Sequence, residues 1–204
     1  MNSAPNLSCN TRKSREKVVD RHHSVGIFVG ALPCGTIVLF DQLYGSEGTE
    51  QVYALVVDFL SKVENKTSIK ELLYDDCCHL KRYSENKKRS MLNENTEYLA
   101  NMSKHIDKFH FRNHIDAWCQ THCNLDHVAN LKGVNSQIWE QIFRKLNAHK
   151  NCKTLSESRF FFMFLYCIVM HNLSLEGLEM LADPRLSFRW ENITIHEVDL
   201  SVTH

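Results

Sequence analysis

The sequence predicts an α/β fold in which a small mixed sheet is followed by a largely helical second half. Three observations favour this class. Two β-branched and aromatic runs lie close together early in the chain, and a third apolar run ends in carboxylates. Amphipathic segments of helical period lie between and after these runs. The chain has 204 residues, 43% hydrophobic and 24% charged, which suffices for one domain with a buried core.

The charges and the apolar runs exclude some classes of protein. Lysine and arginine total 24, as do aspartate and glutamate, so no whole-chain basic field attracts nucleic acid or an anionic membrane. The longest apolar run, residues 160–170, is shorter than the ~20 residues that cross a bilayer, and the polar residues 1–17 contain no signal-peptide core. We therefore expect a soluble intracellular protein without membrane contact, whose eight cysteines are reduced thiols or metal ligands.

Composition divides the chain into three parts. Residues 1–23 are polar and lack periodicity, so we expect a disordered N-terminal segment. The predicted elements fall within residues 24–185, which we interpret as one domain. Residues 186–204 show no consistent period and are interpreted as a C-terminal tail.

The first half of the domain is predicted to contain a hairpin, a helix and a third strand. Residues 24–32 and 36–40 flank a Pro-Cys-Gly turn, a pattern typical of a hairpin. Apolar residues within 52–63 follow the i, i+3, i+4, i+7 spacing of one helix face, with Thr49 as the expected cap. Residues 69–74 predict a strand that ends at a run of acids and thiols, and a charged helix is expected to follow.

The second half is predicted to be mainly helical. Residues 105–111 contain phenylalanines that alternate with polar residues, which indicates a strand. The apolar spacing of residues 138–146 predicts a helix. Thr154 and Glu157 form a capping-box pattern before residues 160–170, and because that helix is apolar on all sides we expect it to be buried.

This order of elements is that of a ribonuclease-H-like domain. Two-metal phosphoryl chemistry in such a domain needs carboxylates from strand ends and from a later helix, because oxygen ligands suit Mg²⁺ or Mn²⁺. Asp75 at the end of a strand and Glu140 on a helix fit two of these positions. The alternatives are that Asp75 and Asp76 close the strand and cap the next helix, and that Glu140 pairs with Arg144.

Several motifs in this order resemble the Kyakuja-Dileera-Zisupton (KDZ) transposases, over about residues 20–175. The motifs are PCG at 33–35, LYGSEGTEQVY at 43–53, YDDCCHLKRY at 74–83, HIDKFHFRNHIDAWCQTHCN at 105–124, NSQIWEQIFRKL at 135–146 and SRFFFMFLY at 158–166. The resemblance implies a DDE-type transposase of ribonuclease-H-like fold that cuts and joins DNA with a divalent metal in the nucleus. It also implies that Asp75 is the second catalytic aspartate, that Glu140 is the catalytic glutamate, and that Asp76 with His79 is the Asp-x-x-His motif.

One part of the family pattern has no clear counterpart. The family's first catalytic aspartate lies on a strand before the hairpin, where Asp20 is the sole nearby candidate and lacks a strand-like approach. We therefore expect a truncated or domesticated remnant without full activity. A nuclease or strand-transferase core is the catalytic hypothesis, and it requires a first carboxylate from an upstream exon, a partner chain (another copy or a complementing chain) or Asp20. The alternatives are a non-catalytic nucleic-acid or protein interaction domain, and the product of a decayed mobile element.

Cysteines and histidines in the second half suggest a zinc site. His110, His114, Cys119 and Cys123, with His122 beside them, place nitrogen and sulfur ligands within a short span, as a structural Zn²⁺ requires. The alternative is that these are ordinary core and surface residues. The vicinal Cys77 and Cys78 are interpreted as buried thiols.

A basic cluster follows the predicted third strand. Its five cationic side chains can track a phosphate backbone, although a solvated helix face is an equal alternative. The cluster consists of Lys81, Arg82, Lys87, Lys88 and Arg89.

Overall fold

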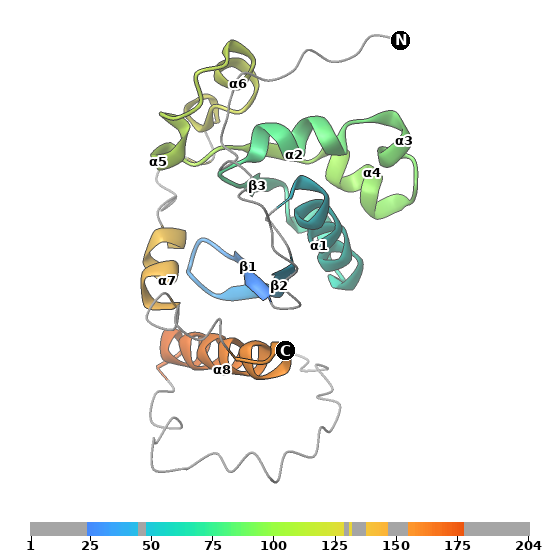
Figure 1. The fold of residues 1–204 in the computed structure, drawn as a ribbon. Coiled ribbons are helices and arrows are strands. Elements are labelled where there is room, and N and C mark those ends of the chain that lie inside the picture. The colour runs from blue at the N-terminus through green and yellow to red at the C-terminus, as the bar shows by residue number, and fades with distance from the viewer. Residues whose placement is uncertain (1–23, 45–47, 129–130, 132–137, 147–154, 178–204) are drawn as a thin grey trace, which may run out of the picture.

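The computed structural model describes residues 24–44, 48–128, 131, 138–146 and 155–177 (Figure 1). Strands and helices mix in the first half and helices dominate the second, which confirms the predicted α/β class. The elements are β1 (Ser24–Ala31), β2 (Ile37–Tyr44), α1 (Thr49–Lys62), η1 (Lys66–Ser68), β3 (Glu71–Leu73), α2 (Cys77–Ser84), α3 (Lys87–Ser90), α4 (Glu94–Asn101), β4 (Ser103–His105), α5 (Lys108–Phe111), α6 (Ala117–His122), η2 (Leu125–His127), α7 (Ile138–Leu146) and α8 (Glu157–Leu175).

The predicted hairpin is confirmed. β1 pairs antiparallel with β2, which runs further than predicted, to Tyr44. The turn is closed by a hydrogen bond from Leu32 N to Thr36 O, 2.9 Å long. Gly35 in this turn has a φ of 94°, a conformation that favours glycine, and a Cβ there would lie 3.3 Å from the Cδ1 atom of Ile138. The turn therefore also allows α7 to approach the hairpin.

The predicted amphipathic helix is confirmed as α1, with a different cap. Gly48 occupies the N-cap position and accepts a hydrogen bond from Val52 N, whereas Thr49 is the first helical residue and is buried. The apolar face of α1 packs on α2 and α4 as the core of the first half. This core contains Val52, Tyr53, Val56, Leu60, Leu80, Leu99 and Met102.

The third strand is confirmed as β3, and it pairs in parallel with β4. α2, α3 and α4 form the crossover between these two strands. Among the described residues, the strands form two sheets of two strands each, so the single mixed sheet that was predicted is absent there. The rings of Phe28 in β1 and Tyr74 after β3 meet edge-on, with centroids 6.3 Å apart, and join the hairpin to the second sheet.

The predicted strand over residues 105–111 is wrong beyond His105. The chain turns at Asp107, whose carboxylate accepts hydrogen bonds from the backbone N–H groups of Phe109 (2.9 Å) and His110 (3.1 Å). This N-cap starts the single turn of α5. The alternation of phenylalanines around residue 110 is therefore a helical turn with an aspartate cap.

The capping box predicted before α8 is also wrong. Ser156 is the N-cap residue of α8, and Thr154 lies outside the described residues. Glu157 instead accepts a hydrogen bond of 2.6 Å from the hydroxyl of Tyr44, and this bond raises the pKa of Tyr44 to about 12. Glu157 thus fastens the start of α8 to the end of β2.

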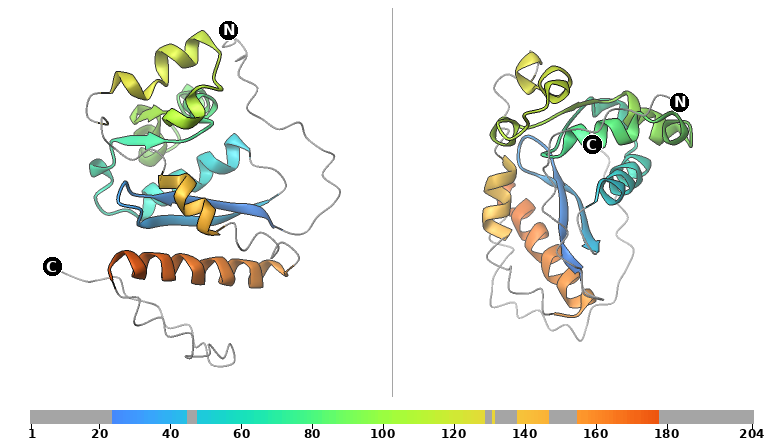
Figure 2. Two further views of the ribbon diagram at one scale, coloured as in Figure 1. Left: turned by 90° about the vertical axis from the view of Figure 1, so that its left-hand side faces the viewer. Right: turned by 45° about the horizontal axis from the view of Figure 1, so that its top comes forward.

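The expectation that α8 is buried on all sides is wrong as well. Phe160, Phe164 and Ile168 are buried against the hairpin, on which α8 lies in Figures 1 and 2. The amide of Asn172 makes two 2.9 Å hydrogen bonds with the backbone of Ile37, one to its N–H and one to its C=O. On another face, Phe162, Leu165, Tyr166 and Val169 are 36–46% exposed. Hydropathy alone does not reveal how many sides of a helix the fold covers.

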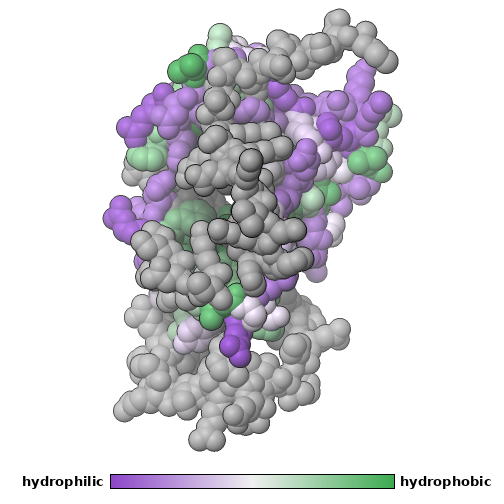
Figure 3. All heavy atoms as spheres, viewed as in Figure 1, coloured by the Kyte–Doolittle hydropathy of each residue, from purple (hydrophilic) through white to green (hydrophobic). Residues whose placement is uncertain are grey.

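α8 is also long and apolar enough to cross a membrane, judged by length and composition within the described residues. This criterion is weak, because core helices of soluble proteins meet it too. In Figure 3, hydrophilic residues cover the surface over α5 and α6 as well as over α3 and α4.

A buried lysine joins α4 to β4. Lys104 is fully buried, and its Nζ donates hydrogen bonds to the carbonyl oxygens of Ala100 (3.0 Å) and Met102 (2.8 Å). These acceptors are at the C-terminal end of α4, where cations are favoured. Burial nevertheless disfavours the charge and lowers the pKa of Lys104 to about 8.

Lys104 is expected to make stability rise with pH. Between about pH 8 and pH 10.5 the unfolded chain holds a proton on this amine that the folded chain has lost, so the free energy of unfolding increases. The increase at this site is about 3 kcal/mol at most. We expect the free energy of unfolding of the wild type, minus that of Lys104→Met, to increase across this pH window. Urea denaturation at several pH values measures this difference. The exposed control Lys88→Met should show a constant difference, and a constant difference for Lys104→Met would contradict the assignment.

Candidate metal centre

The candidate centre is built around Cys78 in the first turn of α2. Tyr74 N donates a 3.0 Å hydrogen bond to His105 O, and Cys77 N donates a 3.2 Å bond to Tyr74 O, so the chain turns sharply from β3 into α2. Cys78 is completely buried by this turn. Its position is therefore set by the parallel pair β3–β4.

Two donors from the segment after β4 reach Cys78. His114 follows α5 and is 2% exposed, and its Nδ1 atom lies 3.6 Å from the Sγ atom of Cys78. Cys119, on α6, is fully buried, and its Sγ lies within 4.8 Å of both other donor atoms. α6 is aligned by Asp116, whose side chain accepts a hydrogen bond from Trp118 N. Three buried donors from two segments thus converge on one point.

Two further donors adjoin the same thiol. The Nδ1 atom of His79 lies 3.5 Å from the Sγ atom of Cys78, and this ring nitrogen donates a hydrogen bond to the carboxylate of Asp76. Asp76 occupies the N-cap position of α2 without a capping hydrogen bond from its side chain. The alternative that Asp76 caps α2 with its side chain is therefore wrong. Asp76 is the N-cap residue, but its carboxylate accepts a hydrogen bond from the ring of His79 and not from the helix backbone.

These donors match the chemistry of zinc. Zn²⁺ binds sulfur at about 2.3 Å and nitrogen at about 2.0–2.1 Å, so sulfur and nitrogen ligands of one tetrahedral ion lie about 3.5 Å apart. The distance from Cys78 Sγ to His114 Nδ1, 3.6 Å, agrees with this value. The Nδ1 atom of His79 is equally close to the thiol, but it donates its hydrogen to Asp76. Burial also lowers the pKa of His114 and so favours the neutral imidazole that binds metals.

Two of the four predicted zinc ligands belong to the cluster, and two do not. His114 and Cys119 converge, whereas Cys123 is buried in a core with Cys77 and Ile106, and His110 points to carboxylates. Cys78 was missed as a ligand, because adjacent cysteines at a strand end are typical of core packing. The predicted neighbour His122 stacks on Trp118 instead, with ring centroids 4.6 Å apart.

The predicted catalytic carboxylates, Asp75 and Glu140, lie outside the groups of convergent metal donors among the described residues. His110 bridges two acids, with Nδ1 2.6 Å from Asp107 Oδ2 and Nε2 3.6 Å from Glu140 Oε1. Asp75 is exposed, yet surrounding protein atoms raise its pKa, as do Asp76 and Asp107 more weakly, while His110 lowers it. Glu140 thus pairs with His110 and not, within the described residues, with Arg144. Asp107 was missed, although it follows β4 much as Asp75 follows β3.

The described residues do not support a magnesium site. The groups of His, Cys, Asp and Glu side chains whose donor atoms converge there are two, Cys78–His114–Cys119 and Asp76–Cys78–His79. Neither contains Asp75 or Glu140. The expectation that these two carboxylates share an Mg²⁺ or Mn²⁺ ion therefore stays a prediction.

The basic cluster is divided by its contacts. The guanidinium groups of Arg82 and Arg89 lie 4.4 Å and 3.6 Å from the ring centroids of Trp118 and Tyr83, and Lys81 donates a hydrogen bond to a backbone carbonyl. Lys87 and Lys88 on α3 are exposed. These two lysines are the members best placed to contact a phosphate backbone.

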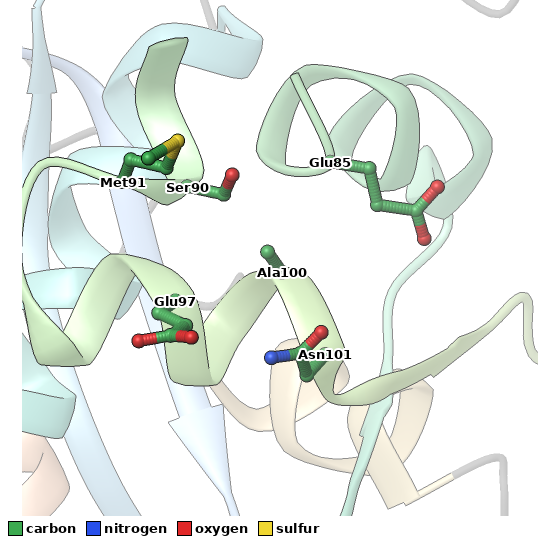
Figure 4. A pocket seen from close by; sticks show the side chains of 6 residues that line it. All are labelled: Glu85, Ser90, Met91, Glu97, Ala100 and Asn101. Atoms are coloured by element: carbon green, nitrogen blue, oxygen red, sulfur yellow. The ribbon is translucent and has the colours of Figure 1, made fainter. Parts of the chain in front are cut away.

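A hollow on the surface of α2, α3 and α4 has a different character. Figure 4 shows the side chains around it, which include two carboxylates and no cysteine or histidine. They belong to Glu85, Ser90, Met91, Glu97, Ala100 and Asn101. None of the residues singled out from the sequence lines this hollow.

Comparison of the chain with protein-family models, with curated proteins and with solved structures finds no match.

Substitution of Asp107 is expected to reduce stability much more than substitution of Asp75. Asp107 is 6% exposed and accepts three hydrogen bonds, so Asp107→Ala should lower the free energy of unfolding by about 2 kcal/mol. Asp75→Asn keeps an oxygen for the 2.8 Å hydrogen bond from Asp76 N and removes a charge that the fold does not stabilise. We expect it to change stability by less than ~0.5 kcal/mol. Denaturation at pH 7 checks both, and equal losses would make Asp75 a structural residue.

Proposed function

We propose that this chain is a transposase-derived domain, similar to the KDZ family, in which a zinc ion fastens the segment after β4 onto α2. The observation that carries the proposal is the convergence of Cys78, His114 and Cys119 at one buried point. Cys78 belongs to the motif at 74–83, whereas His114 and Cys119 belong to the motif at 105–124. Residues that carry the family resemblance in two separate motifs therefore serve one site.

The proposed zinc has a structural role. α5 has four residues and α6 has six, and helices of this length have little stability of their own in water. Buried cysteine and histidine ligands supply folding free energy directly when they bind zinc. The metal thus compensates for a segment whose helices are too short to bury much apolar surface.

The arrangement of acids supports a nuclease ancestry. Asp75 and Asp107 follow two adjacent parallel strands, and Glu140 reaches the same place from a later helix through His110. Carboxylates from strand ends and a later helix are what two-metal chemistry requires. A DDE enzyme would hold Mg²⁺ or Mn²⁺ here, with its first aspartate on a further strand.

Binding without cleavage is the activity favoured for the chain alone. The donor atoms of Asp75 and Glu140 do not form a convergent group in the described part of the chain. DNA is the partner that the resemblance implies, in the nucleus, and the exposed Lys87 and Lys88 offer charge for its phosphates. Cleavage would then need a carboxylate from another copy or from a complementing chain.

Zinc is expected to stabilise the fold measurably. The purified chain should contain about one zinc per molecule. At a free zinc concentration 1,000-fold above the Kd, binding contributes about 4 kcal/mol, or a rise of about 10 °C in Tm. Metal analysis and thermal unfolding with and without a chelator measure both quantities.

Two cysteine variants give a matched comparison for the zinc site. Cys78→Ser should lose the metal and the chelator-sensitive part of the Tm. Cys34→Ser removes an exposed thiol on the hairpin turn and should retain both. Equal zinc content in the two variants, or a wild-type chain without zinc, would contradict the proposal.

DNA binding is expected to depend on α3 and on salt. Each lysine that contacts a phosphate contributes about one unit to the slope of log Kd against log salt. Lys87→Ala with Lys88→Ala should therefore lower the slope by about two, whereas Lys62→Ala with Lys145→Ala, also exposed, should not. Fluorescence anisotropy with a DNA duplex at several salt concentrations measures the slope. Addition of Mg²⁺ or Mn²⁺ should produce no cleavage of that duplex. Cleavage that Asp75→Ala abolishes would instead favour an active nuclease.

A further inference from the structure

We propose that Ser90 is a phosphorylation site for a serine kinase that selects basic residues before its acceptor, and that the phosphate weakens the contact of α3 with DNA. The site is formed by residues 87–92, which are three cations, then the serine, then two apolar residues. The effect on DNA rests on the DNA binding proposed above, whereas the modification itself does not.

Two serines in this region follow cationic residues, and the structure separates them. Ser84 follows Lys81 and Arg82 at the end of α2, is completely buried, and donates a 3.0 Å hydrogen bond to Lys81 O. Ser90 ends α3 and is partly exposed, and its Oγ donates a longer hydrogen bond, 3.3 Å, to Lys87 O. A kinase must reach the hydroxyl, so Ser90 is the accessible acceptor of the two.

The residues on either side of Ser90 offer contacts for such a kinase. Lys87 and Lys88 are exposed, and a kinase cleft lined by acids discriminates in favour of such charges. Met91 and Leu92 follow the serine directly and are 82% and 67% exposed, so they present an apolar contact after the acceptor. α3 has only four residues, and a helix this short opens locally at little cost to enter a cleft.

The hollow beside Ser90 restricts where a phosphate can lie. The carboxylates of Glu85 and Glu97 line this hollow together with Ser90 (Figure 4). A phosphate carries about −1.5 to −2 charges at pH 7, and it is repelled by carboxylates and by the C-terminal end of a helix, where Ser90 lies. We expect the modified side chain to turn away from the hollow, where Lys87, three residues earlier, is its neighbour on the helix surface.

The transfer requires only ATP as a co-reactant. The bond between the γ-phosphoryl group and ADP breaks while the bond to Ser90 Oγ forms, and the hydroxyl proton passes to a carboxylate of the kinase. The negative charge that is added about equals the positive charge of Lys87 and Lys88 together. The phosphate should therefore cancel the contribution of these two lysines to DNA binding.

Phosphorylation of the full chain tests the site. The chain is treated with the catalytic subunit of cyclic-AMP-dependent protein kinase and Mg²⁺-ATP, and mass spectrometry locates the phosphate. All chains carry Ser14→Ala, since Ser14 also follows two basic residues. We expect close to one phosphate on Ser90, none on the matched control Ser84, and the loss of this phosphate in Ser90→Ala. A native chain that is not modified on Ser90, or is modified there only after denaturation, would overturn the site.

DNA binding provides the second measurement. The phosphorylated chain should bind a DNA duplex about 10- to 100-fold more weakly at 0.1 M salt, with a salt slope lower by about two, and a phosphatase should restore both. Ser90→Ala treated with the kinase should bind as the unmodified chain does. Unchanged binding after phosphorylation, while Lys87→Ala with Lys88→Ala still weakens it, would overturn the effect on DNA. If the unmodified chain does not bind DNA, the proposed DNA binding and its control both fail, and the mass spectrum decides the Ser90 site independently.

Discussion

The parallel pairing of β3 with β4 is the constraint on which the candidate centre depends. Both strands are only three residues long, and both leave the pair at the same edge. The chain after β3 carries Asp75, Asp76 and Cys78, and the chain after β4 carries Asp107 and His114. Acids and metal donors far apart in the sequence therefore meet because two short strands end together. A shift of one residue in this register would turn every side chain of the shifted strand to the other face.

Beyond that edge, polar contacts organise the chain more than apolar packing does. Asp107, Asp116 and Asn124 each occupy an N-cap position and accept hydrogen bonds from the backbone of the next short helix. The buried apolar residues of this segment are few: Ile106, Cys119, Cys123 and Leu125. An N-cap residue fixes where a short helix begins, but it contributes only about 1 kcal/mol to stability. It also buries little apolar surface. A bound metal is the kind of cross-link that such a segment needs.

Local patterns in the sequence were sufficient for part of the fold. The hairpin, α1, β3 and α7 were predicted, because their periodicity and turn residues act over a few neighbouring positions. The phenylalanines near residue 110 predicted a strand wrongly, since one aspartate cap outweighs a short alternation. The residues of the candidate zinc cluster were predicted only in part, for a related reason. The spacing of neighbouring residues favoured His110 and Cys123, whereas the donor that joins His114 is Cys78, 36 residues earlier. No local spacing encodes such a contact.

The side-chain amide of Asn172 in α8 occupies part of the edge of β2. Its oxygen and nitrogen satisfy both backbone groups of Ile37, as a neighbouring peptide would, and those groups point away from β1. A side chain of α8 thus stands in for a strand at the outer edge of β2. Because unpaired edges invite other chains to pair with them, this contact blunts the edge of β2 at Ile37. A second chain that paired with β2 at this position would first have to displace the Asn172 amide from both of its hydrogen bonds.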